Sequence, residues 1–163
     1  MLVGPSRNSS GVGRTLVALA LVGLLAAGGC AGSPTSRTSW SDTAEQAVGQ
    51  LVSGLGTAKV VLEANTAARL THAYAVGTLT DALETADKEV GAFDVVQPPD
   101  DLHPLADRIT RELYDAALLL REVRTEVTSP DLTRDAAQEL LDRVEDALDS
   151  LDTLSATVSE VRR

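Results

Sequence analysis

The last part of the chain, residues 130–161, carries a strict seven-residue apolar repeat, and no other feature constrains the fold as much. Leu141 and Leu148 widen this apolar face beyond the narrow seam of a two-stranded coiled coil. A helix with such a face is stable only when other helices cover it. The repeat therefore predicts an all-α fold. Two interleaved sets make up the repeat: Ala137, Val144, Leu151 and Val158, and Leu140, Ala147, Leu154 and Val161.

Three further segments have apolar residues at alternating spacings of three and four, the period of an amphipathic helix. Aromatic residues make up only 2% of the chain, so Leu, Val and Ala must fill the core, which suits closely packed helices. Four helices of similar length with short connections predict an antiparallel, up-down-up-down four-helix bundle over residues 42–163. The predicted helices are 42–66, 71–93, 101–128 and 130–161.

Capping residues and prolines predict where these helices begin and end. Asp42, with Glu45 three residues later, has the form of a capping box at the start of the first helix. The prolines of VVQPPDD, residues 95–101, end the second helix because proline lacks the backbone donor. A break is predicted between Asn65 and Thr71, where Thr71 can act as an N-cap. A single continuous helix stays an open alternative, because neither proline nor glycine separates the two stripes.

Residues 1–29 have the organisation of a signal peptide. A basic segment ends at Arg14, the apolar run Leu16–Ala27 follows, and two glycines precede Cys30, the only cysteine of the chain. The apolar run is shorter than the roughly 20 residues that span a bilayer. It has the length and the flanks of the apolar region of a cleaved signal.

The segment Ala27-Gly28-Gly29-Cys30 resembles the lipobox of bacterial lipoprotein precursors, which usually have Leu at the position of Ala27. The resemblance implies cleavage between Gly29 and Cys30 and a diacylglycerol on the Cys30 thiol, with acyl chains such as palmitate. The protein would then be lipid-anchored at the extracytoplasmic face of the cell membrane. A secreted protein with a free thiol and a protein with a short membrane anchor are the alternatives.

Residues 30–41 are predicted to be the lipidated Cys30 and a flexible linker, because AGSPTSRTSWS is rich in Ser, Thr, Gly and Pro. Trp40 before a helical segment, LTHAYAV at 70–76 and VQPPDDL at 96–102 resemble small uncharacterised helical lipoproteins of actinobacteria. That family has no assigned activity, so the resemblance implies the fold and the location alone.

The charge distribution argues against nucleic-acid binding. The net charge is −10, and every acidic residue lies at or after Asp42, so the body lacks the clustered Lys and Arg that phosphate binding needs. Catalysis also lacks candidates, because acylation of Cys30 leaves no thiol, and no serine-containing nucleophile elbow is present. His72 and His103 lie near predicted helix ends, where surface or capping roles are common. We expect no enzyme activity, no metal site and no cofactor.

Glycines mark the one candidate contact surface of the first helix. Gly49, Gly54 and Gly56 are predicted to allow close helix packing or to form a groove for a partner or ligand. The segment Gly54–Lys59 imitates part of a phosphate-binding loop, but no strand precedes it, so we expect no such loop.

Two further groups of polar residues are expected to have ordinary structural roles. Tyr74 and Tyr114 could line a pocket between helices, although a bundle tyrosine more often buries its ring and exposes its hydroxyl. The last helix carries an acidic face that we expect to be solvated rather than metal-binding. Its members are Asp142, Glu145, Asp146, Asp149 and Asp152.

These observations favour a membrane-anchored, non-catalytic helical module that binds an envelope protein or a cell-wall component, or that supports the envelope. The membrane contact would be made through the diacylglycerol on Cys30. The alternative is a bundle at the cell surface that binds a small ligand or a cation. A filled core with an exposed groove favours the first function, and a sizeable cavity between the helices favours the second.

Overall fold

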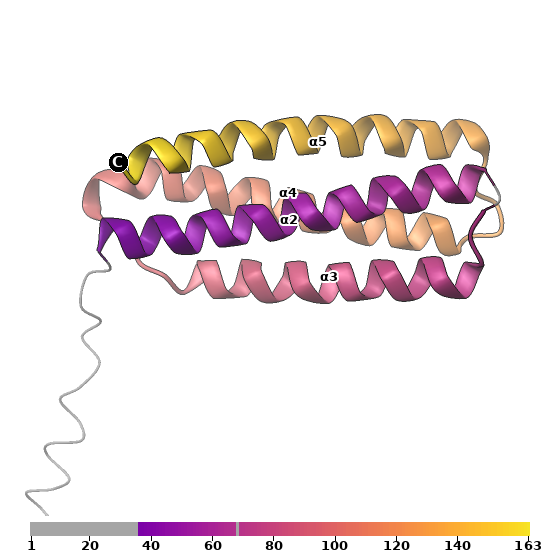
Figure 1. Cartoon of the computed structure of the whole chain (residues 1–163), viewed down its shortest axis with the longest axis horizontal. Helices are drawn as coiled ribbons and strands as arrows, with labels where there is room; N and C mark the ends of the chain where they lie inside the picture. Colours follow the sequence, from indigo (N-terminus) through magenta and orange to yellow (C-terminus); the bar gives the residue numbers. More distant parts are fainter. Residues whose placement is uncertain (1–35, 68) are drawn as a thin grey trace, which may run out of the picture. The chain divides into compact units, whose positions relative to one another are not determined.

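The computed structural model describes residues 36–67 and 69–163, which form helices and no strands (Figure 1). This confirms the predicted all-α class and the number of helices. The predicted signal peptide, its cleavage site at Gly29 and the lipidated Cys30 lie outside the described residues. The elements are α2 (Arg37–Thr66), α3 (His72–Asp94), the short 3-10 helix η1 (Asp100–Leu102), α4 (His103–Thr128) and α5 (Arg134–Val161).

The first described helix begins earlier than the sequence predicts. Ser36 is the N-cap of α2, and its side chain accepts a hydrogen bond from the Ser39 backbone nitrogen at 3.2 Å. The predicted capping box at Asp42 is therefore wrong, because Asp42 already lies inside the helix. Residues 37–41, predicted to belong to the linker, are helical, since Trp40 is drawn into the core.

Two threonine N-caps define the later boundaries. Thr71 caps α3 by accepting from the Tyr74 backbone nitrogen, so α2 and α3 are separate helices with the break between Thr66 and His72. Thr133 caps α5 by accepting from the Ala136 backbone nitrogen at 3.2 Å. The last helix therefore begins after the turn at residues 129–133, and the predicted start at residue 130 is wrong. Pro130 after Ser129 predicts the earlier start, because proline is favoured in the first turn of a helix, but Thr133 supplies the side-chain acceptor at the N-cap.

The core runs through all four helices and is filled by aliphatic side chains. At one end Trp40 and Phe93 add an aromatic pair, with ring centroids 6.0 Å apart. α2 contacts each of the other three helices, whereas α3 and α5, within the described residues, do not contact one another. The largest fully buried side chains are Trp40, Leu51, Leu55, Leu62, Leu79, Ile109, Leu113, Leu120, Leu151, Leu154, Val48 and Val123.

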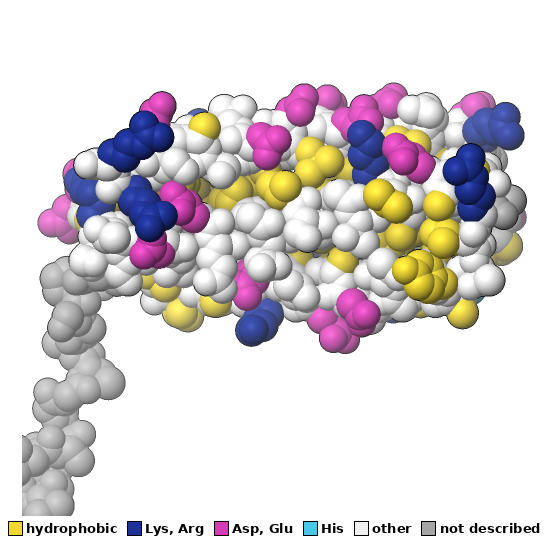
Figure 2. Space-filling model, viewed as in Figure 1, with side chains coloured by type: hydrophobic (Ala, Val, Ile, Leu, Met, Phe, Trp, Pro, Cys, Tyr) yellow, Lys and Arg dark blue, Asp and Glu magenta, His cyan; other side chains and the backbone are white. Residues whose placement is uncertain are grey.

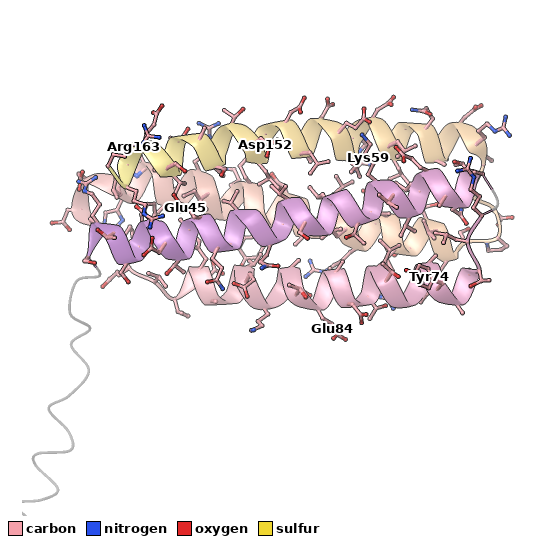
Figure 3. All side chains as sticks on the ribbon, in the orientation of Figure 1. Glu45, Lys59, Tyr74, Glu84, Asp152 and Arg163 are labelled. Atoms are coloured by element: carbon pink, nitrogen blue, oxygen red, sulfur yellow. The ribbon has the colours of Figure 1, made fainter. Side chains whose placement is uncertain are left out.

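Ion pairs join the helices at the surface. The Arg162 guanidinium lies 2.9 Å from a Glu45 carboxylate oxygen, which ties the end of α5 to the first turns of α2. The Lys59 ammonium extends toward α5 and lies 2.7 Å from Glu145, and the hydrogen bond from Lys59 to this carboxylate raises the lysine pKa (Figure 3). Pairs this exposed contribute little to the free energy of unfolding, so the buried apolar side chains carry the stability.

Candidate functional site

The three candidate glycines have three different environments. Gly54 is buried, and a Cβ atom placed on it would lie 3.2 Å from Leu120 Cδ1, so this glycine allows α2 and α4 to pack closely. Gly49 is exposed, and a Cβ atom there would meet nothing within 4 Å. Gly56 is half-buried, and a Cβ atom there would also meet nothing within 4 Å. This glycine lines a surface groove. Close helix packing is therefore the role of Gly54 alone.

We expect valine to destabilise the protein at Gly54 and to be tolerated at Gly49. The branched side chain at Gly54 would overlap Leu120 and should lower the free energy of unfolding by about 1–3 kcal/mol, the usual cost of overpacking. Gly49→Val, the matched control, should change it by less than about 0.5 kcal/mol because helix propensity rises slightly and nothing is displaced. Urea unfolding of residues 34–163 measures both values, and equal stability of the two variants would contradict the packing role.

A groove runs along the surface between α2 and α3. Its wider part has a volume of about 500 Å³ and is lined without a charged residue. Toward the middle of the helices it continues past Ser53, Thr57 and Thr78 to Asp81, the single charged residue along it. We call this the α2–α3 groove. The side chains at its wider part are Ser53, Gly56, Thr57, Val60, Val61, Ala64, Leu70, Tyr74 and Thr78.

Large apolar side chains are exposed at this groove. Val60 is 62% exposed and Tyr74 is 61% exposed, and both line the wider part. Figure 2 shows apolar side chains gathered at the end of the bundle where α2 leads into α3, and Figure 3 shows Tyr74 at the same end. Residues 46–58 of α2 and 70–80 before and within α3 contain no Asp, Glu, Lys or Arg, and Lys59 and Glu63, which follow on α2, do not line the groove. Charge depletion with an exposed tyrosine is typical of interface cores.

The remaining candidates lie apart from the groove and from one another. The segment Gly54–Lys59 lies inside α2 and forms no phosphate loop. His72 and His103 are the first residues of α3 and α4 and are exposed. The five acidic residues of α5 are exposed or bonded locally, as in the Gln138–Asp142 hydrogen bond of 2.9 Å. Within the described part of the chain no group of three or more His, Cys, Asp or Glu could hold a metal ion.

Tyr114 joins two helices through a hydrogen bond of its hydroxyl rather than lining a pocket between them. Its hydroxyl donates a hydrogen bond to Asp94 of α3, and this bond raises the pKa of Tyr114. A comparable inter-helix bond joins Arg143 of α5 to Glu122 of α4 at 2.5 and 2.6 Å, and it lowers the pKa of Glu122. These contacts hold neighbouring helices together, and Arg143 also lines a shallow pocket between α4 and α5 with Glu112, Asp115 and Asp146.

A polar cluster near the start of α2 was not predicted from the sequence. Glu89 is buried and accepts a hydrogen bond from Gln46 at 2.9 Å. Ser41 and Trp40 are fully buried, and within residues 36–67 and 69–163 neither the Ser41 hydroxyl nor the Trp40 indole nitrogen has a hydrogen-bond partner. In the sequence, Glu89 lies between Ala86 and Val90, which are buried apolar residues of α3. This position could have indicated that Glu89 is buried. This cluster has the character of core structure, because it opens onto none of the grooves described above.

Comparison with known proteins gives no relative. No protein-family model matches the chain, and neither a curated protein nor a solved structure is significantly similar to it. None of the described helices combines the length and the hydropathy of a membrane-spanning segment. The function must therefore be inferred from the residues and their arrangement.

Proposed function

We propose that this chain is a lipid-anchored, extracytoplasmic lipoprotein whose helical body is a non-catalytic interaction or envelope-support module. One observation carries the proposal for the body: an uncharged groove with exposed Val60 and Tyr74 lies open on the surface, outside a core of buried aliphatic side chains. An exposed apolar surface of this kind favours protein contacts. The lipobox resemblance at Cys30 supports the anchor.

We further propose that the four helices alternate in direction as an up-down-up-down bundle. Contacts between the beginning of one helix and the end of another support this topology. Trp40 near the start of α2 packs against Phe93 near the end of α3, with the rings tilted by 53°. Arg162 at the end of α5 pairs with Asp42 at 3.2 Å, again near the start of α2. The connections between the helices are also short, as this topology requires.

A photo-crosslinking residue at Val60 tests the interaction module in intact membranes. We expect irradiation to attach one specific envelope protein or wall fragment to the protein. The same residue at Leu118, 56% exposed on α4, is the matched control and should attach much less of it. Cys30→Ala should abolish the product, because the body would leave the membrane surface. Identical products from Val60 and Leu118, or none from either, would contradict the proposal.

The groove also favours a second candidate, a module that binds a small ligand. Its volume of about 500 Å³ lies within the range of ligand pockets, and Tyr74 lines it. This candidate predicts that a neutral lipid or a wall fragment raises the melting temperature of residues 34–163 and that Tyr74→Ala removes the effect. A flat response would reject it.

A further inference from the structure

We propose that the α2–α3 groove is the interface with a second copy of this chain, packed antiparallel across a two-fold axis at the level of Thr57 and Thr78. The inference concerns the surface invoked for the interaction module, but it needs neither the lipid anchor nor an envelope partner. Charge, the spacing of the anchoring residues and the size of the face carry it.

Charge restricts where two copies can meet. Residues 36–163 contain all 24 acidic residues and 12 of the 14 basic residues, so two bodies repel one another. α5 carries exposed acidic side chains along its length, and α4 carries exposed side chains of both signs, such as Asp107, Arg111 and Asp115. The face formed by residues 46–58 and 70–80 carries no Asp, Glu, Lys or Arg, so contact there costs the least electrostatic free energy.

The residues along the groove are self-complementary about its centre. Thr57 and Thr78 line both parts of the groove, so they mark the same level on α2 and α3. On α3, Tyr74 precedes Thr78 by four residues and Asp81 follows it by three, which corresponds to about 6 and 4.5 Å along the helix. A two-fold axis at this level therefore places each Tyr74 hydroxyl beside Asp81 of the other copy.

The pairing of Tyr74 with Asp81 satisfies both groups. The tyrosine hydroxyl can donate a hydrogen bond to the carboxylate, which is the only charge along the groove. The same chemistry occurs inside the molecule, where the Tyr114 hydroxyl donates to Asp94 between α4 and α3. An isologous interface forms each such contact twice, so one complementary pair contributes two bonds.

Two open glycines lie near the axis. Gly56 of α2 and Gly77 of α3 are within one residue of Thr57 and Thr78, and a Cβ atom on either would meet nothing within 4 Å. Neither glycine serves packing inside the molecule, although each interior glycine costs about 1 kcal/mol relative to alanine. At the axis they allow the backbones of the two copies to approach closely.

The size of the face predicts a weak dimer. The face that α2 and α3 form along the groove extends from Gln50 to Ala64, which corresponds to about 21 Å of helix, and it is about two helix diameters, or 20 Å, wide. A footprint of this size is about half of the roughly 800 Å² per partner of a standard specific interface. Dimerisation should therefore depend on protein concentration, and tethering to one membrane would strengthen it by raising the effective concentration.

Analytical ultracentrifugation of residues 34–163 tests the association. The weight-average mass should rise toward twice the monomer mass as the concentration increases from micromolar to millimolar. Val60→Glu places a charge on each side of the interface and should keep the protein monomeric. Leu118→Glu adds the same charge at an equally exposed position of α4 and should leave the dimer intact. Circular dichroism checks that both variants keep their helices.

Cysteine crosslinking tests the antiparallel arrangement. Residues 34–163 contain no cysteine, so Gly77→Cys introduces a single thiol. Two thiols beside the axis should form an intermolecular disulfide under mild oxidation, and Leu118→Cys should not. A monomer at every concentration, a dimer that survives Val60→Glu, or a dimer whose Gly77→Cys form does not crosslink would overturn the proposal. The protein can prove monomeric in solution and still crosslink through Val60 to an envelope component in membranes. That pair of results would reject the dimer and leave the proposed interaction module intact.

Discussion

Cys30→Ala should transfer the protein from the detergent phase to the aqueous phase when cell membranes are extracted and partitioned. The expected loss is nearly complete, because each buried methylene of an acyl chain contributes about 0.8 kcal/mol and two chains anchor a protein firmly. None of the described helices has the length and hydropathy to replace the anchor. The body carries an excess of acidic residues, which disfavours binding to anionic lipid.

Mass spectrometry shows whether a change in partitioning comes from loss of the lipid on Cys30 or from a precursor that keeps residues 1–29. The wild-type chain should begin at Cys30 and carry the mass of the attached diacylglycerol. Ser33→Ala, a small substitution just after the lipobox, is the matched control and should behave as the wild type. If Cys30→Ala keeps residues 1–29 and stays in the membrane, the apolar run Leu16–Ala27 is the anchor. A wild-type chain without added mass at Cys30 would contradict lipidation.

The sequence predicted the helices well where apolar periodicity is strong and buried. In α5 both interleaved sets of the seven-residue repeat face the core, with Leu151, Leu154 and Val158 almost fully buried. In α3 the apolar residues predicted to face the core are Ala73, Val76, Leu79, Leu83, Ala86, Val90 and Phe93. This stripe holds from Leu79 onward, but at its start Ala73 is exposed and Ala75, outside the stripe, is buried.

The candidate groove was only partly predictable. The sequence marked the glycines, and it also contains the two uncharged stretches, 46–58 and 70–80. What it lacks is the information that these stretches lie side by side, since that follows from how α2 packs on α3. Gly54 and Gly56 are two residues apart and therefore lie on different sides of one helix, so Gly54 faces Leu120 of α4 and borders only the part of the groove near Asp81, whereas Gly56 lines the wider part. Periodicity alone gave no reason to separate them.

Trp40→Ala should lower the free energy of unfolding of residues 34–163 by about 3–5 kcal/mol, the usual cost of removing a buried aromatic side chain. Trp40 is fully buried and packs on Phe93, so its removal leaves a cavity between α2 and α3. Its indole nitrogen has no hydrogen-bond partner among the described residues, so we expect the loss to come mainly from packing. Trp40→Phe should therefore recover more than half of the stability. Denaturant unfolding measures the three free energies.

A shorter fragment tests the same point without a substitution in the core. Residues 42–163 match the body predicted from periodicity, but they lack Trp40, the Ser36 cap and the 2.5 Å Arg37–Asp101 ion pair. We expect this fragment to unfold at a clearly lower denaturant concentration than residues 34–163. Arg37→Ala, which removes only the exposed ion pair, should cost less than about 1 kcal/mol and is the control. Equal midpoints for the two fragments would contradict a core that includes Trp40. Since Trp40 lies ten residues after Cys30, a large effect would mean that the predicted lipid anchor joins the chain almost directly at the core.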